Sequence, residues 1–123
     1  GASTASANAE TAGHMDIYGG VNLFYSWLAV ARHNGTTTSA PQGLVSTLNV
    51  YGGETTCANM NLDYADDTSY TSHAEVNIHG GRLTATGILR LDHAASDATI
   101  NVDGGTMTVE GVSVGSKVMG SGT

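Results

Sequence analysis

A pair of adjacent glycines recurs four times in the chain, each time between two stretches of alternating apolar residues. The pairs end at Gly20, Gly53, Gly81 and Gly105, so successive copies are 33, 28 and 24 residues apart. The clearest copy reads INVDGGTMTVEGVSVG over residues 100–115, and VNIHGGRLTATGILRL over 76–91 follows it closely. A pattern that repeats at this spacing is typical of repeat proteins, in which each copy forms one structural unit.

Each copy predicts short β-strands joined by corners. In the third copy Val76 and Ile78 alternate with Asn77 and His79, which is the period of a strand. The glycine pair that follows permits backbone angles closed to other residues. A second alternating stretch, another glycine and a third short stretch complete the copy. We therefore predict an all-β parallel β-helix, a solenoid of about four coils with three short strands per coil, whose coils begin near residues 15, 48, 76 and 100.

Corresponding apolar positions predict columns of side chains, stacked from one coil to the next about 4.8 Å apart. The length differences between copies fall after the third stretch, where a coil can bulge outward without disturbing the stack. Cys57 falls in the middle stretch and is expected to point inward as a small apolar side chain. The four predicted columns are Met15, Leu48, Val76 and Ile100; Ile17, Val50, Ile78 and Val102; Leu28, Met60, Leu89 and Val112; and Val30, Leu62, Leu91 and Val114.

The first 14 residues differ from the rest of the chain. They are rich in Ala, Ser and Thr and show no apolar periodicity, and the GHM at 13–15 resembles what a cloning site leaves behind. We therefore predict a tag or flexible linker over 1–14 and a single repeat domain over 15–123.

Composition excludes some classes of function. The formal net charge is −7, and the four Lys and Arg residues are scattered singly, which argues against nucleic-acid binding. No apolar run approaches the ~18 residues of a membrane span, so membrane insertion is not expected. The single cysteine excludes a disulfide within the chain.

Each repeat has an alternating stretch with Asn, then Gly-Gly, a Thr-centred stretch, a further Gly and a short strand. This order resembles the autotransporter-type β-strand repeats of bacterial surface proteins. The resemblance is strong over residues 46–115 and weak over 15–45. It implies a right-handed parallel β-helix in a secreted or cell-surface setting, associated with adhesion or polysaccharide. It implies no particular activity.

The outward positions before the glycine pairs predict a binding surface. Aromatic rings that stack on sugar rings, beside amides that bond sugar hydroxyls, would form a carbohydrate-binding face. Stacked Asn residues that bond one another along the solenoid, shielded by tyrosines, explain the same pattern without a ligand. The candidate ligand-binding residues are Tyr18, Tyr51, His79, Asn49, Asn77 and Asn101, with Asp16 and Asp103 in the same two columns.

Trp27 stands with Phe24 and Tyr25 in the irregular first copy. These aromatic residues have two interpretations. They cap the N-terminal end of the stack, where apolar core would otherwise be exposed, or they form a binding platform, and Trp27 is therefore a further candidate ligand-binding residue.

Acidic residues cluster in two equivalent corners. Stacking would place Asp63 near Asp92 and Asp67 near Asp97, where a Ca²⁺ ion would relieve the repulsion between carboxylates. A solvated acidic loop, in which salt screens the charges, is the alternative. Calcium is thus the one cofactor that the sequence suggests, with no firm requirement for any.

Catalysis is not expected. Arg90 beside Asp92 and His93 is the nearest set to the acid–base site of a Ca²⁺-dependent polysaccharide lyase, but no second basic residue joins it. The five histidines lack zinc-site spacing. Thr56, Thr84 and Thr108 form one threonine column where ice binding would need a regular pair. The sequence predicts a non-catalytic carbohydrate-binding or adhesive module; a lyase fragment and a structural solenoid remain as alternatives.

The C-terminal residues SKVMGSGT begin another corner without a polar cap. An uncapped β-helix exposes unpaired backbone groups that invite another chain to add on. Either this is a segment of a longer solenoid, or copies stack end to end.

Overall fold

The computed structural model describes residues 13–32, 42–64, 71–91, 97–114 and 117–122. These residues form nine β-strands in two sheets, and every strand pair is parallel. The first sheet has the order β1 (His14–Ile17), β3 (Gln42–Val50), β5 (Thr71–Ile78), β7 (Asp97–Val102) and β9 (Lys117–Gly122). The second has the order β2 (Val21–Arg32), β4 (Glu54–Tyr64), β6 (Arg82–Leu91) and β8 (Thr106–Val114). The expected all-β, parallel architecture is confirmed.

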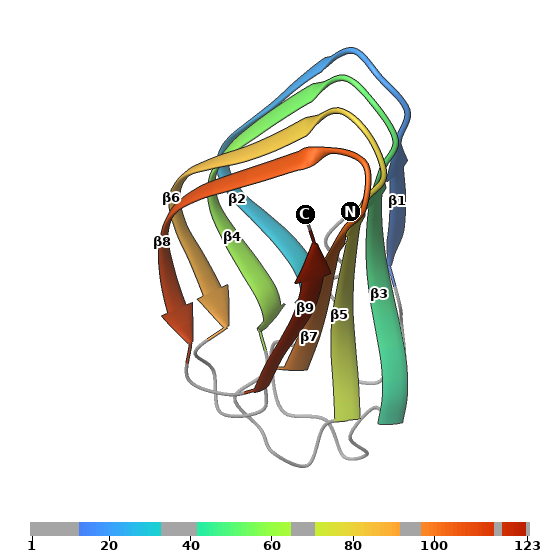
Figure 1. Ribbon diagram of the computed structural model, residues 1–123. Coiled ribbons are helices and arrows are strands. Elements are labelled where there is room, and N and C mark those ends of the chain that lie inside the picture. The colour runs from blue at the N-terminus through green and yellow to red at the C-terminus, as the bar shows by residue number, and fades with distance from the viewer. Residues whose placement is uncertain (1–12, 33–41, 65–70, 92–96, 115–116, 123) are drawn as a thin grey trace.

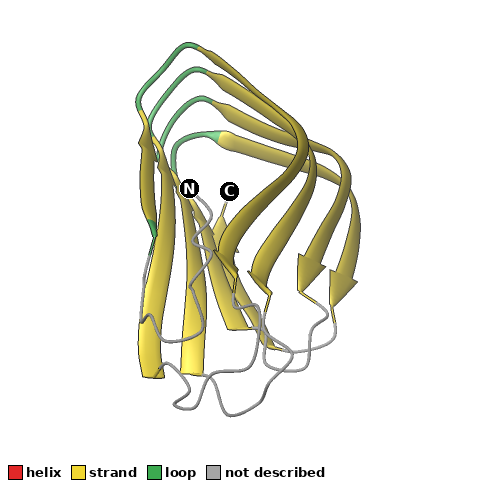
Figure 2. Ribbon diagram, turned by 180° about the vertical axis from the view of Figure 1, so that it is seen from behind, coloured by secondary structure: helices red, strands yellow, loops and turns green. Residues whose placement is uncertain are grey.

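The odd-numbered strands form one sheet and the even-numbered strands form the other, so that successive repeats lie side by side. Figure 1 shows the two sheets facing each other, with the connections from odd to even strands stacked at the top. The same arrangement is seen from behind in Figure 2, where four short loops follow one another at that corner. β1 begins at His14, one residue before the predicted start of the repeat domain.

The sheet register confirms the predicted columns. Met15 pairs with Leu48, Leu48 with Val76, and Val76 with Ile100. In the second sheet Leu28 pairs with Met60, Met60 with Leu89, and Leu89 with Val112. Because the side-chain period of a strand is two, this register points the paired residues of each column to the same side of the sheet. Val112, at the end of its column, was expected to point into the core but is 59% exposed.

The structure differs from the expected three strands per repeat. The predicted second and third stretches form one long strand, so each complete repeat has two strands. A register shift in the long strand, between Cys57 and Met60 in β4, marks the place where a corner was expected. There the Asn59 side-chain oxygen accepts the N–H of Ile88 at 2.9 Å, and the Thr86 hydroxyl donates to the Cys57 carbonyl. These side-chain bonds replace ladder bonds, and the strand bends without ending.

The glycine corners are where the backbone approaches most closely. Gly20, Gly53 and Gly81 adopt φ values of 81°, 79° and 72°. A Cβ at Gly53 would lie 2.5 Å from the Gly20 carbonyl oxygen. The N–H of Glu54 bonds to that same carbonyl at 2.9 Å, and the next corner repeats the bond from Arg82 to Gly53. Both the conformation and the lack of space therefore require glycine at the stacked corners.

The hydrophobic core lies between the two sheets and is densest in the middle repeats. Leu48, Val50, Met60, Leu62 and Ile78 are at most 1% exposed. Met15 and Phe24 at one end, and Ile100, Val102, Met107 and Val109 at the other, are only partly buried. Cys57 is 1% exposed in this core, which confirms its expected inward orientation.

Candidate functional site

The outer face of the first sheet carries the predicted Asn and aromatic columns, and we call it the ladder face. It presents Asp16 from β1, Asn49 from β3, Asn77 from β5 and Asn101 from β7. Directly after these four strands come, in the same order, Tyr18, Tyr51, His79 and Asp103. The register pairs Asp16 with Asn49, Asn49 with Asn77, and Asn77 with Asn101. The structure therefore brings together all the predicted ligand-binding residues except Trp27.

Three asparagines of the ladder face form a continuous chain of hydrogen bonds. Asn101 donates to the side-chain oxygen of Asn77, Asn77 to that of Asn49, and Asn49 to the carboxylate of Asp16, each at 2.9 Å. Asn77 also donates to Glu75 at 3.1 Å. The amide groups that would bond sugar hydroxyls are thus engaged with one another.

The rings of the ladder face also stack on one another. The centroids of Tyr18 and Tyr51 lie 5.1 Å apart with an interplanar angle of 10°, and those of Tyr51 and His79 lie 5.2 Å apart at 19°. Near-parallel rings at this centroid separation are offset-stacked, because two rings lying side by side in one plane would collide at this distance. Tyr51 consequently faces a ring on each side and turns its edge to solvent. A sugar needs a free ring face, and the geometry leaves the freest one at Tyr18, which is 73% exposed.

His79 ends the aromatic stack against an acidic side chain. Its Nδ1 lies 2.9 Å and 3.1 Å from the two carboxylate oxygens of Asp103. The column that the sequence predicted as Tyr, Tyr, His and Asp is therefore a set of contacts between consecutive repeats.

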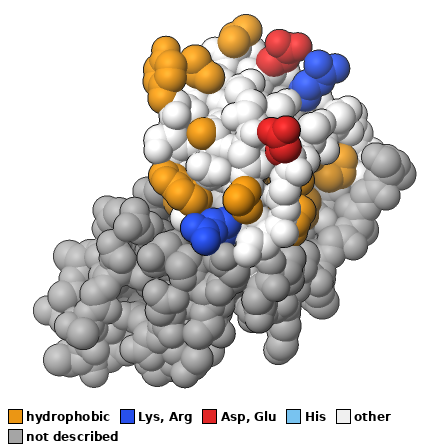
Figure 3. Space-filling view, turned by 90° about the vertical axis from the view of Figure 1, so that its left-hand side faces the viewer, with side chains coloured by type: hydrophobic (Ala, Val, Ile, Leu, Met, Phe, Trp, Pro, Cys, Tyr) orange, Lys and Arg blue, Asp and Glu red, His pale blue; other side chains and the backbone are white. Residues whose placement is uncertain are grey.

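Trp27 lies on the other sheet, on the outer face of β2. Its neighbours along that face are also apolar and exposed, with exposed fractions of 85% for Val21, 54% for Leu23, 88% for Tyr25 and 45% for Trp27. We call these four residues the β2 strip. Figure 3 looks onto the outer face of this sheet and shows hydrophobic side chains along one border of it and in separate places elsewhere on the face.

Two residues of the β2 strip have polar counterparts in the other repeats. The register places Val21 beside Glu54, Arg82 and Thr106, and Leu23 beside Thr56, Thr84 and Thr108. In the first repeat the usual alternation is inverted at this point, because polar Asn22 lines the interior and its apolar neighbours face outward. Alternation alone would assign the apolar residues to the core, and only comparison with the aligned copies could have found the inversion.

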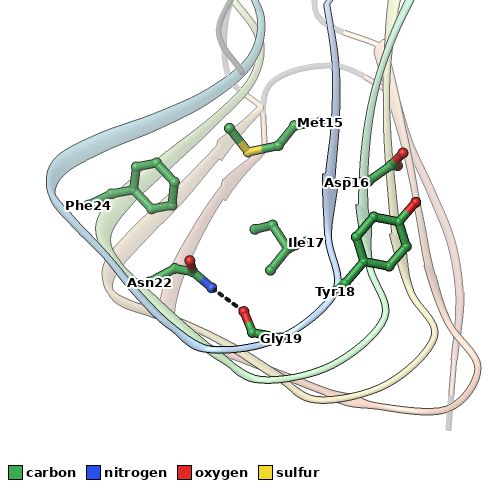
Figure 4. A pocket seen from close by; sticks show the side chains of 7 residues that line it. All are labelled: Met15, Asp16, Ile17, Tyr18, Gly19, Asn22 and Phe24. Atoms are coloured by element: carbon green, nitrogen blue, oxygen red, sulfur yellow. Dashed lines mark hydrogen bonds between the residues drawn. The ribbon is translucent and has the colours of Figure 1, made fainter.

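Phe24, by contrast, points inward. Together with Met15 and Ile17 it lines a hollow of about 270 Å³ at the end of the core, between β1 and β2. Figure 4 shows these three side chains directed into the hollow and Tyr18 and Asp16 directed away from it. The aromatic cluster of the first repeat is thus divided, with Phe24 at the end of the core and Tyr25 and Trp27 on the outer surface.

The predicted calcium residues fall into two groups. Asp67 and Asp92 lie outside the described residues. Asp63 is fully buried, and its two carboxylate oxygens accept bonds from the Ser72 hydroxyl at 2.5 Å and from the Asp97 N–H at 2.9 Å. Asp97 in turn contacts His73 at 3.0 Å. Among the described residues, no three His, Cys, Asp or Glu side chains gather as a metal site would require.

Arg90 lies on the exposed side of β6, in register with Asn61 and Ser113. Asp92 and His93, its expected partners in a lyase site, lie outside the described residues.

Burial raises the pKa of the Cys57 thiol to about 11. The thiol is therefore protonated at neutral pH, and the protonated form is a poor nucleophile and metal ligand. The position of Cys57 in the core explains this residue as a small apolar side chain.

No protein family, curated protein or solved structure matches this chain. Among the described residues there is no helix with the length and apolar character to cross a membrane.

Proposed function

We propose that this chain is a non-catalytic module of a secreted or cell-surface protein that binds polysaccharide or cell-surface glycan. In this proposal the parallel strands wind as a right-handed β-helix of about four coils, which presents long, regular outer faces. The β2 strip is the observation that carries the proposal. Four exposed apolar side chains, two of them aromatic, lie on one strand, and the positions aligned with Val21 and Leu23 in the other repeats are polar.

The β2 strip suits a glycan better than the ladder face does. Tyr25 and Trp27 expose large ring surfaces, and aromatic rings bind the apolar faces of sugars while polar neighbours bond the hydroxyls. Thr56 and Glu54, on the adjacent strand β4, supply such polar groups. On the ladder face the corresponding groups already bond one another, which supports a stabilising role there.

Affinity electrophoresis against neutral and acidic plant, algal and bacterial polysaccharides tests the proposal. We expect one of these polymers to retard the protein, and Tyr25→Ala together with Trp27→Ala to reduce its affinity at least about tenfold, as for loss of a central aromatic contact. Tyr18→Ala is the matched control, since it removes an exposed tyrosine from the other sheet. Loss of binding in Tyr18→Ala alone would place the site on the ladder face, and no retardation by any polymer would overturn the proposal.

A structural solenoid that stacks end to end is the second candidate. β1 and β9 are the outer strands of the first sheet and run in the same direction, so a second copy can continue that sheet. The apolar hollow lined by Met15, Ile17 and Phe24 supports it, because a further coil would cover the hollow. Light scattering should then show elongated species that grow with concentration, and a monomer at every concentration would exclude self-stacking.

A further inference from the structure

Three polar side chains near the start of the ladder face are arranged as a nucleophile, a base and an orienting acid. His73 lies on β5, and Asp97 and Thr99 lie two residues apart on the neighbouring strand β7. The His73 Nδ1 is 3.0 Å from an Asp97 carboxylate oxygen, and its Nε2 is 2.9 Å from the Thr99 hydroxyl. The imidazole thus bridges a carboxylate and a hydroxyl through its two nitrogens.

The bonding pattern assigns a role to each nitrogen of the neutral ring. The Asp97 carboxylate can only accept, so Nδ1 carries the proton and donates it. In this tautomer Nε2 is the acceptor, and the Thr99 hydroxyl donates a hydrogen bond to it. A hydroxyl bonded to a base that a carboxylate orients is the arrangement that activates nucleophilic Ser and Thr residues in unrelated folds.

The buried carboxylate of Asp63 fixes the position of this cluster. Asp63 accepts from the hydroxyl of Ser72, the residue before His73, and from the backbone N–H of Asp97. It is 0% exposed, so these bonds are shielded from water. The two strands that carry the base and its orienting acid are therefore tied to one fixed group.

A second His–Asp pair, without a hydroxyl, lies directly after the same two strands. His79 contacts Asp103 in the way that His73 contacts Asp97. However, the residue two positions after Asp103 is Gly105, where the first pair has Thr99. Gly105 has no side chain, so this position offers no hydroxyl to the second pair. The His79 pair is a natural internal control.

We propose that Thr99 is an acyl-acceptor nucleophile, with His73 as its general base and Asp97 as the positioning residue. In the proposed step the Thr99 oxygen attacks the carbonyl carbon of an activated carboxylic ester while its proton passes to His73 Nε2. The carbon–oxygen bond to the leaving group breaks, and that group departs with the electron pair. Thr99 is left as an acyl ester, and His73 then releases its proton to the leaving group or to solvent.

The surroundings define which substrates this site takes. The side chains of His73 and Asp97 are 25% and 43% exposed, so a small reagent can reach them. Backbone N–H groups in a sheet interior are engaged in its ladder, which leaves few donors to stabilise an oxyanion. Esters with good leaving groups, which need less such help, are therefore the expected acyl donors.

Incubation of the intact protein with p-nitrophenyl acetate, followed by mass spectrometry of the protein and of its peptides, tests the proposal. We expect one added acetyl group, located on Thr99 rather than on Lys117 or the N-terminus. Because a general base contributes about 10²–10⁴-fold, His73→Ala should lower the labelling rate of Thr99 by at least about tenfold. Thr99→Val, which keeps the shape of the side chain, should abolish labelling at this site. His79→Ala should leave the rate unchanged.

Two further variants separate activation from folding. Asp97→Asn should lower the rate, because an amide can donate to Nδ1 and so favour the wrong tautomer, and Asp97→Glu should restore part of it. Far-ultraviolet circular dichroism checks that each variant keeps its sheet structure. Equal labelling of Thr99 in the parent and in folded His73→Ala would overturn the proposal. Acetylation of other residues with none on Thr99 would overturn it as well.

Discussion

At the scale of single residues, the structure gives the conspicuous side chains of the ladder face a neighbour in the next repeat. The predicted sugar-binding amides bond to one another, the rings stack, and His79 meets Asp103. Asp63, suggested by the sequence as a calcium ligand, is a buried acceptor for a serine hydroxyl and a backbone N–H. Polar residues that look like a site along the chain are thus largely satisfied within the fold.

The buried thiol yields a prediction about reactivity. Because burial raises the pKa of Cys57 to about 11, almost no thiolate forms in the folded protein at pH 8. Alkylation by iodoacetamide should be far slower in buffer than in denaturing urea. Mass spectrometry over a time course measures both rates. Similar rates in the two solutions would show that Cys57 is accessible in the native state.

Two glycines provide a matched pair for testing the corners. Gly20 and Gly53 share a positive φ, but an added Cβ meets nothing within 4 Å at Gly20 and lies 2.5 Å from a backbone oxygen at Gly53. Gly20→Ala should cost about 1 kcal/mol of unfolding free energy from backbone strain. Gly53→Ala should cost about 3 kcal/mol or more, since strain and overpacking add. Urea denaturation followed by circular dichroism measures both, and equal losses would contradict the stacked corner.

At the scale of strands and sheets, the long strand of each repeat shows how side chains replace backbone bonds. The register shifts at Cys57/Met60 and Ala85/Ile88 would leave N–H groups without ladder partners. Asn59 supplies an acceptor to Ile88, and a Cβ at Gly87 would collide with that same Asn59 side chain. The bend is therefore built from a specific Asn and Gly, and it keeps one strand continuous where the sequence suggested two.

The asparagine ladder should contribute to the stability of the first sheet. Asn77 lies at its centre, donating to Asn49 and Glu75 and accepting from Asn101. Asn77→Ala should lower the unfolding free energy by about 1–3 kcal/mol, because partly buried partners lose their bonds. Glu110→Ala, at an exposed position of β8, should change it by less than about 0.5 kcal/mol. Denaturant unfolding of both variants compares the two, and equal values would show that the ladder is energetically neutral.

At the scale of the whole molecule, strands that follow each other in sequence do not pair. Each strand pairs with the second strand along the chain, so paired residues are separated by about one repeat. The Asn ladder joins residues 33, 28 and 24 positions apart. The fold therefore depends almost entirely on contacts between distant segments.

This topology predicts slow folding. Long loops must close before parallel pairs form, and all-β proteins with non-local pairing fold in milliseconds to seconds, against microseconds to milliseconds for helical bundles. We expect refolding from urea to take about a second or longer. Stopped-flow circular dichroism measures it, and complete refolding within a millisecond would contradict a fold built from distant pairs.

Local pattern was sufficient for the alternating stretches, the glycine corners and most positions of the inward columns, because alternation and backbone freedom are properties of neighbouring residues. Repetition added the register, since aligned copies must place like residues side by side. The bend that joins two stretches into one strand, the outward β2 strip and the meeting of His73 with Asp97 and Thr99 could not be obtained in this way. Each depends on which strand lies beside which and on the exact residue that fills the space between them, and that is settled only when distant segments pack.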